Sequence, residues 1–311
     1  MTVVFFGTSA FGLPSLEAIA GSHHTLKAIV STPDKPQGRN LKVQASPIKR
    51  WAVDRSIHYL DFSKDHPSEI LSALKKLNAD VFVVISFGVI LKKEVLGLPR
   101  LMPLNVHASL LPKYRGATPM QAAIIHQDAE TGVTVIKMAE KLDAGDILLK
   151  KKTPLSRDET IETLEKRLSV LAAESVLEAL DAVEKGRVTL TPQNENKVSL
   201  TQKIVKNDGK IDWNESADRI HAKLHAYLGW PGSFFFFRGK RIVLCEAHPA
   251  PVSRAAAAGT VLEASAENGI FVAAGEKTAL KLEKLQLEGR QTLPWKEFIR
   301  GFPIESGDVL E

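Results

Sequence analysis

The chain has 311 residues, of which 44% are hydrophobic and 25% charged, and this composition favours a folded protein with enough apolar residues for two domains. Its one cysteine, Cys245, excludes an internal disulfide framework and any metal cage built from several thiolates. The net charge is +5, and residues 206–311 hold equal numbers of basic and acidic residues, so the excess lies in the first 205.

Short β-branched apolar runs alternate with helical patterns through the first half of the chain. Strands are expected at residues 2–6, 26–31, 57–60, 80–86, 103–107 and 131–138, and helices at 13–20, 47–55, 67–77, 119–126 and 160–184. Because strands that alternate with helices form βαβ units, this pattern predicts an α/β fold, with a Rossmann-like parallel sheet covered by helices on both faces.

The pattern changes in the second half. Residues 186–205 are polar and without periodicity, which favours a linker. Beyond them, short strands separated by Gly, Asn and Pro predict a small antiparallel barrel of the OB-like type. We therefore expect an α/β domain at 1–185, a linker at 186–205 and a C-terminal β-barrel domain at 206–311.

No segment has the length of a membrane span or the form of a secretory signal. The first apolar run, at residues 3–6, has the length of a strand and ends in Gly7. We expect a cytoplasmic protein with no membrane partner, and a monomer, because the sequence shows no long apolar surface stripe.

The segment from Asp34 to Arg50 has five basic residues, one acid, two prolines and a glycine. This composition predicts a basic loop that runs into a helix beginning at Ser46-Pro47. The loop is either a solvated surface feature or a contact for a polyanion, since clustered Lys and Arg suit phosphate backbones.

Two patterns lie where strands are expected to end. Gly7–Gly12 follows the first strand, but it lacks the G-x-G start of a dinucleotide fingerprint, which favours a tight turn from strand to helix. Asn105 and His107 lie two residues apart, on one face and at the carboxyl end of a strand, where open α/β sheets bind ligands. An amide beside an imidazole suits a developing oxyanion, although a lone His is more often structural.

Asp143 lies in the turn LDAGD, after the strand expected at 131–138. Its carboxylate either points to the same strand ends or bonds to its own turn. His107 and Asp143 supply only two metal ligands, fewer than the three of a catalytic zinc site, so we expect no metal.

Several motifs together resemble the folate-dependent formyltransferase family. They are NVHASLLPKYRGATP from Asn105, TGVTVIKMAEKLDAGDIL from Thr131, PDKPQGR, SFGVIL, KNDGKIDW and GWPGSF, and they extend over most of the chain. Ala108 and Ala144 stand where the family commonly has Gly and Thr, which leaves the reacting groups unchanged.

The resemblance implies a function and a set of site residues. The chain would transfer the formyl group of 10-formyltetrahydrofolate, a co-substrate, to the α-amino group of initiator methionyl-tRNA, in support of translation initiation. Asn105, His107 and Asp143 would be catalytic. The folate would lie against the turn at Leu142 and against Phe87, Gly88, Val89, Ile90, Leu91, Leu110 and Pro112.

The chemistry agrees with these roles. Attack by the amine on the formyl carbon gives an oxyanion, to which Asn105 and a protonated His107 can donate. Asp143 can hold the imidazolium and help to pass a proton to the departing folate nitrogen. No enzyme nucleophile is required.

Formyl-transfer chemistry alone does not identify the acceptor, because relatives formylate a purine precursor or an amino sugar nucleotide. The basic segment, with Arg39 and Lys42, and the barrel, with Lys206 and Lys210, favour tRNA. Arg238, Lys240 and Arg241 are further candidates. A sugar-nucleotide formyltransferase would have little use for the basic segment, and a non-catalytic RNA-binding protein would not need the three catalytic residues.

Overall fold

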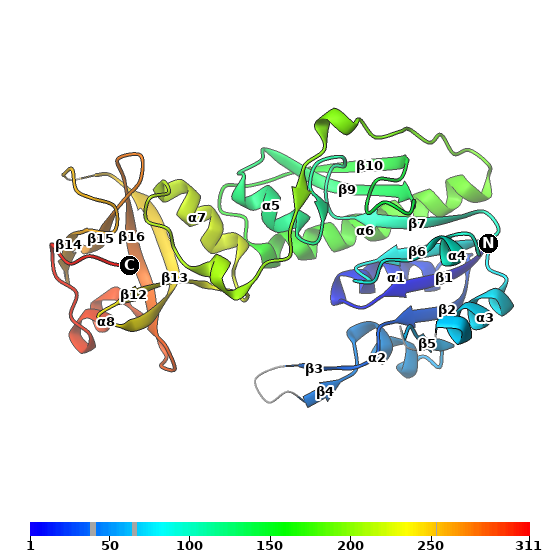
Figure 1. Ribbon diagram of the computed structural model, residues 1–311, viewed down its shortest axis with the longest axis horizontal. Helices are drawn as coiled ribbons and strands as arrows, with labels where there is room; N and C mark the ends of the chain where they lie inside the picture. The colour runs from blue at the N-terminus through cyan, green and yellow to red at the C-terminus, as the bar shows by residue number, and fades with distance from the viewer. Residues whose placement is uncertain (38–41, 64–66, 253) are drawn as a thin grey trace. The chain divides into compact units, whose positions relative to one another are not determined.

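The computed structural model describes residues 1–37, 42–63, 67–252 and 254–311, and it divides into two compact units (Figure 1). The first unit comprises residues 1–119, 130–154 and 164–201, and the second comprises 120–129, 155–163 and 202–311. No helix in these ranges is long and apolar enough to cross a membrane.

The first unit is built on a seven-stranded sheet in the order β10-β9-β7-β6-β1-β2-β5. Its strands are β1 (Thr2–Gly7), β2 (Thr25–Ser31), β5 (Tyr59–Asp61), β6 (Val81–Ile85), β7 (Met102–His107), β9 (Glu130–Lys137) and β10 (Ile147–Pro154). Its helices are α1 (Leu13–Ala20), α2 (Pro47–Asp54), α3 (Pro67–Leu77), α4 (Lys93–Leu96) and α6 (Ile161–Glu184), and α5 (Pro119–Ile125) lies mainly in the second unit.

The central strands are buried on both faces, as a parallel sheet between helices requires. On one face, Phe6 and Phe82 pack with Ile70 and Leu74 of α3 in a single hydrophobic cluster. This arrangement confirms the α/β class predicted from the sequence.

One strand departs from the parallel sheet that the sequence predicts. β9 pairs antiparallel with both β7 and β10, and every other neighbouring pair in the sheet is parallel. A tight connection joins β9 to β10, and such a hairpin needs no crossover helix. The sequence did not predict β10, because this edge strand carries Lys150, Lys151 and Lys152 in place of an apolar run.

The basic segment also differs from the loop that was expected. Its backbone forms the antiparallel pair β3 (Lys35–Gln37) and β4 (Lys42–Gln44). The helix start was predicted correctly, since Ser46 caps α2 by accepting a hydrogen bond from the Lys49 N–H at 3.0 Å.

The second unit is an antiparallel sheet in the order β12-β13-β16-β15-β14, with β17 beside β16. Its elements are α7 (Ala217–Ala226), β12 (Ser233–Phe237), β13 (Lys240–Ala250), β14 (Val261–Ser265), β15 (Gly269–Ala274), β16 (Thr278–Leu287), β17 (Thr292–Pro294) and α8 (Trp295–Gly301).

The last residues of the chain join the two edges of this sheet. Glu311 exchanges backbone hydrogen bonds with Phe236 of β12, and the carbonyl of Asp308 accepts from Val261 of β14. The edges are thereby bridged, as in the small barrel predicted from the sequence. Phe235 and Phe237 of β12 lie in its core.

Candidate active site

Asn105 and His107 lie on one face of β7, where the strand ends. β7 runs parallel to β6, with Asn105 opposite Val84, and antiparallel to β9, with His107 opposite Thr134. His107 is buried and Asn105 is partly exposed. No residue in the described part of the chain forms a hydrogen bond with the Asn105 side chain, so its amide is available to a ligand.

The loop after β7 forms hydrogen bonds with β9 and with the His107 ring. The hydroxyl of Thr134 donates to the Ser109 carbonyl at 2.6 Å and accepts from the Leu111 N–H at 3.1 Å. Further along this loop, the carbonyl of Tyr114 lies 2.9 Å from Nε2 of His107. When Nε2 carries the proton and donates to this carbonyl, Nδ1 is the ring nitrogen left for the reaction.

Asp143 faces that second nitrogen. Its Oδ2 lies 3.7 Å from Nδ1 of His107 and accepts a 2.9 Å hydrogen bond from the N–H of Gly116. The backbone of Asp143 is left-handed, with φ of 51°. Two positions further on, a Cβ at Gly145 would lie 1.8 Å from the Lys137 carbonyl, so this turn requires glycine. The turn therefore points the carboxylate at the end of β7.

A buried arginine supports the Asp143 turn indirectly, through a glutamine that both of them contact. Arg115, only 2% exposed, donates to Oε1 of Gln193 at 2.9 and 3.1 Å and to Oε1 of Glu195 at 2.7 Å. Gln193 in turn donates to the carbonyls of Asp143 at 2.7 Å and Gly145 at 2.8 Å. The bond from Arg115 lowers the pKa of Glu195.

Sequence reasoning missed this network. Arg115 lies inside the motif that starts at Asn105, but an arginine in a loop is usually solvated. Gln193 and Glu195 lie in the polar stretch interpreted as a linker. The end of that stretch, β11 (Leu200–Thr201), pairs with β8 (Arg115–Gly116).

Most of the residues proposed for folate follow β6 and β9, and Leu110 and Pro112 follow β7. Phe87 and Leu91 are buried, whereas Ile90 is 70% exposed and Leu142 is 55% exposed. The Thr8 hydroxyl donates to the Phe87 carbonyl at 3.3 Å and so helps to fix the segment after β6. Two large apolar side chains of these segments thus face solvent.

Other contacts bring these two segments together. Val89 and Met138 pack against the same hydrophobic cluster, and Nζ of Lys93 lies 3.9 Å from Glu140. Gly88 has a left-handed backbone, and Leu110 and Pro112 are partly buried in the loop after β7.

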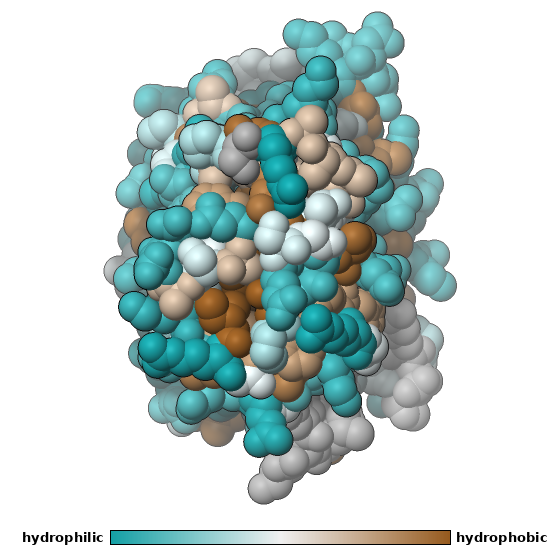
Figure 2. Space-filling view, turned by 90° about the vertical axis from the view of Figure 1, so that its left-hand side faces the viewer, coloured by the Kyte–Doolittle hydropathy of each residue, from teal (hydrophilic) through white to brown (hydrophobic). Residues whose placement is uncertain are grey.

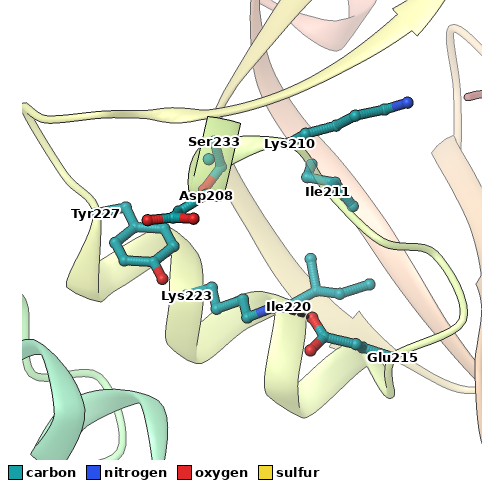
Figure 3. Close-up of a pocket in the computed structure, with 9 residues that line it drawn as sticks. Asp208, Lys210, Ile211, Glu215, Ile220, Lys223, Tyr227 and Ser233 are labelled. Carbon is teal, nitrogen blue, oxygen red and sulfur yellow. Dashed lines mark hydrogen bonds and ion pairs between the residues drawn. The ribbon is translucent and has the colours of Figure 1, made fainter. Parts of the chain in front are cut away.

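The proposed tRNA contacts divide into two groups. Arg39 lies outside the described residues, and of Lys42 only the backbone, in β4, is described. Lys206 and Lys210 are exposed in the second unit. Figure 3 shows Lys210 extending away from a small hollow near Tyr227 and Lys223. The charge of Lys223 is paired with Glu215 at 2.5 Å, so this hollow does not offer that lysine to an anion.

Comparison with known proteins assigns a class to this fold and site. Residues 1–180 match the formyl transferase family, and residues 203–303 match the formyl transferase C-terminal domain. Among solved structures, the sugar 3N-formyl transferase WlaRD has a TM-score of 0.67 at 17% identity, with 94% of this chain and 99% of that chain covered. HypX from Aquifex aeolicus has a TM-score of 0.61 at 19% identity, covering 96% of this chain and 48% of that one. These two likenesses concern the fold.

Similarity over the full length is more specific. The methionyl-tRNA formyltransferase of Methylacidiphilum infernorum is 40% identical over 100% of this chain and 98% of its own length. That of Sulfurihydrogenibium is 34% identical over 100% of both chains. The chain belongs to the methionyl-tRNA formyltransferase family, which confirms the resemblance seen in its motifs.

Proposed function

We propose that this formyltransferase takes its formyl group from 10-formyltetrahydrofolate and gives it to the α-amine of initiator methionyl-tRNA. The amine attacks the formyl carbon, the bond between that carbon and the folate nitrogen breaks, and the nitrogen leaves with a proton. The observation that carries the proposal is the meeting of Asn105, His107 and Asp143 at the end of β7, in a chain whose full-length relatives are methionyl-tRNA formyltransferases.

Each of the three side chains has a role in this reaction. The unpartnered amide of Asn105 donates to the oxyanion that forms on the formyl group. A doubly protonated His107 donates from Nε2 to Tyr114 and presents Nδ1–H to the reacting atoms beside Asp143. The 3.7 Å between Nδ1 and Oδ2 exceeds a hydrogen bond, so a substrate atom or a small shift can bridge it.

The folate is proposed to bind between the segments after β6 and β9. A solved HypX from Aquifex aeolicus is a complex with tetrahydrofolic acid, at 17% identity and a TM-score of 0.61. The apolar side chains of Ile90 and Leu142 are exposed, so they can pack against the ring system of the folate. The proposed contacts are Phe87, Gly88, Val89, Ile90, Leu91, Leu110, Pro112 and Leu142.

The outer face of β12 supports contact with RNA. Phe235 and Phe237 point into the core, so Phe234 and Phe236 lie on the other face, with ring centroids 5.8 Å apart. Arg241 lies over the Phe234 ring at 4.0 Å. Phe234 is buried, so the partly exposed Phe236 is the ring of this pair that a base can reach, and an aromatic ring among cations is typical of surfaces that bind nucleic acid.

The basic residues around this face differ in whether their charge is already paired with a carboxylate. Lys210 lies 5.7 Å from the Phe236 ring centroid. Arg238 is committed to Asp308 at 3.5 Å, whereas Lys206 and Lys240 have no ion pair within the described ranges. Polar side chains cover most of the face seen in Figure 2, with smaller apolar areas between them. We propose Lys206, Lys210 and Lys240 as contacts for tRNA phosphates.

Arg39 and Lys42 are proposed to contact the acceptor stem, on the charge of their segment alone. We also propose that the enzyme acts as a monomer in the cytoplasm, where initiator tRNA is charged and used.

A panel of acceptors tests the function. The purified chain is given 10-formyltetrahydrofolate with methionyl initiator tRNA, methionyl elongator tRNA, glycinamide ribonucleotide or an amino sugar nucleotide, and formylated product is measured. We expect formylation of the initiator tRNA in clear excess over the other three. Preference for the sugar nucleotide would overturn the acceptor assignment and leave the formyl-transfer chemistry intact.

A further inference from the structure

Four side chains of types that can bind a metal ion lie close together at the end of the first unit opposite the candidate active site. His23 and His24 lie in the turn between α1 and β2, and Asp181 and Glu184 lie three residues apart on one face of α6. One ligand atom from each of the four lies within 4.8 Å of the others. His24 precedes the amino end of β2, whereas Asn105 and His107 stand at a carboxyl strand end, so the cluster belongs to the other edge of the sheet.

The spacing of the donor atoms suits a tetrahedral cation. Oδ1 of Asp181 lies 3.3 Å from Nε2 of His24 and 3.7 Å from Nε2 of His23. Ligands bound to zinc at its usual bond lengths lie about 3.3 Å from one another. The closest pair, Nε2 of His23 and Oε2 of Glu184 at 2.7 Å, is a hydrogen bond. It must open slightly, and the largely exposed His23 side chain has room to shift.

The His24 ring supplies an independent observation. Its side chain is fully buried, and its Nε2 makes no hydrogen bond among the described residues. The nearby Asp181 oxygen is within ion-pair distance, but the geometry is not that of a hydrogen bond. A buried polar nitrogen without a partner is costly, and a metal ion on its lone pair would remove that cost.

The turn that carries the two histidines is ordered by its own hydrogen bonds. The Ser22 hydroxyl donates to the Ile19 carbonyl at 2.7 Å and accepts from the His24 N–H at 3.1 Å. Because this turn is fixed, the buried His24 ring is held in place before any ion arrives.

Neighbouring cations limit which ligand atoms are open to such an ion. The α-ammonium of Met1 donates to Oε1 of Glu184 at 2.7 Å and lies 3.4 Å from Nδ1 of His24, which leaves Oε2 and Nε2 as the ligand atoms. With a metal on Nε2, the ring proton lies on Nδ1, so the Met1 ammonium gives up its 3.4 Å contact with Nδ1 and keeps its hydrogen bond to Oε1 of Glu184. Lys185 faces the other oxygen of Asp181 at 3.9 Å.

We propose that His23, His24, Asp181 and Glu184 bind one divalent cation of the zinc type. Histidine nitrogens with carboxylate oxygens are donors that zinc accepts, and four protein ligands leave no open position for catalysis. The ion is therefore structural: it ties the turn before β2 to the end of α6 and takes no part in formyl transfer.

Zinc binding to the full chain, without an affinity tag and stripped of metal by a chelator, tests this site. Zinc chloride is added in competition with a chromophoric chelator, and thermal unfolding is followed with and without zinc. The wild type should bind one equivalent and gain thermal stability. His23→Gln and Asp181→Asn, both at partly exposed positions, should bind at least about tenfold more weakly and lose the gain.

His58→Gln is the matched control, because His58 is an exposed histidine outside the cluster. It should bind zinc as the wild type does. Failure of the wild type to bind a stoichiometric ion would overturn the proposal and would leave the cluster as a partner for the α-ammonium alone. Equal binding by wild type, His23→Gln and Asp181→Asn would also overturn it. Circular dichroism of the metal-free variants separates lost binding from lost folding.

Discussion

The N–H of Gly116 donates a 2.9 Å hydrogen bond to Oδ2 of Asp143, the same oxygen that lies 3.7 Å from Nδ1 of His107. One carboxylate oxygen therefore links the loop after β7 to the turn after β9. Thr201, from a segment far along the chain, pairs with Gly116 in the short sheet of β11 and β8 and so fixes the direction of its amide. The position of Asp143 thus depends on backbone contacts as much as on its own turn.

Gly116→Ala should lower kcat for formyl transfer by about tenfold or more, because a Cβ there would lie 2.4 Å from the Thr201 carbonyl at a φ of 118°. The shift would move the amide that holds Asp143. Steady-state kinetics with methionyl-tRNA measures the loss. Gly97→Ala is the control, since its backbone has φ of −88° and its nearest contact is 3.4 Å. A normal kcat for Gly116→Ala would contradict this account.

His107→Ala should reduce kcat by at least about a hundredfold while the Kd for tRNA stays within twofold, because the ring serves the transition state and not the acceptor's phosphates. Single-turnover formylation and filter binding measure the two quantities. Near-normal turnover would refute the catalytic role.

Gln193→Glu keeps the length of the side chain and removes its two donor hydrogen bonds. The glutamate can still accept from Arg115, but it cannot donate to the carbonyls of Asp143 and Gly145, so the turn loses both supports. We expect kcat to fall about ten- to a hundredfold, with KM for tRNA little changed. Asn194→Ala, which removes only a local bond to the Asn196 N–H, should keep full activity. Equal kcat for Gln193→Glu and wild type would show that the Asp143 turn keeps its conformation without Gln193.

Some residues of this site can be predicted from the local sequence pattern, and others cannot. Asn105 and His107 could be predicted because strand periodicity puts them on one face at a strand end. Asp143 needed the family resemblance, since a turn aspartate has ordinary local uses. Its partner Gln193 could not be predicted at all: a polar residue in a polar stretch carries no pattern, and its contacts come from a segment fifty residues away.

The fold shows the same division. Buried strands such as β1 and β6 are apolar on both faces and were predicted within a residue or two. The direction of β9 is set by its pairing with β7 and β10, which no single-strand pattern encodes. The exposed edge strand β10 resembles a solvated segment in sequence, because lysines protect sheet edges.

Lys210→Ala combined with Lys240→Ala should weaken tRNA binding and flatten its salt dependence. Each lost phosphate contact removes about one from the slope of log K against log salt. Filter binding from low to moderate salt measures the slope, and kcat at saturating tRNA should be unchanged. Lys76→Ala, at an exposed position of α3, is the control and should keep the wild-type slope. An unchanged slope for the double variant would place the tRNA elsewhere.

His221 should make the enzyme less stable in mild acid. Burial is the main cause that lowers its pKa to about 4, with smaller contributions in the same direction from nearby His225, His248 and Arg157 and an opposing one from Asp158. The unfolded state, with an ordinary histidine pKa near 6.5, takes up a proton as the pH falls below that value, whereas the folded state does not. Stability is therefore full above about pH 6.5, and about 3 kcal/mol of it is lost by pH 4.

Urea unfolding at several pH values tests this prediction through the difference between variants, which removes the contribution of the other titrating groups. His221→Leu cannot take up the proton, so its free energy of unfolding should fall less steeply between pH 6.5 and 4 than that of the wild type. His58→Gln changes an exposed histidine and should follow the wild-type curve. If His221→Leu and wild type ran parallel throughout this range, the buried ring would take up its proton in the folded protein as readily as in the unfolded chain.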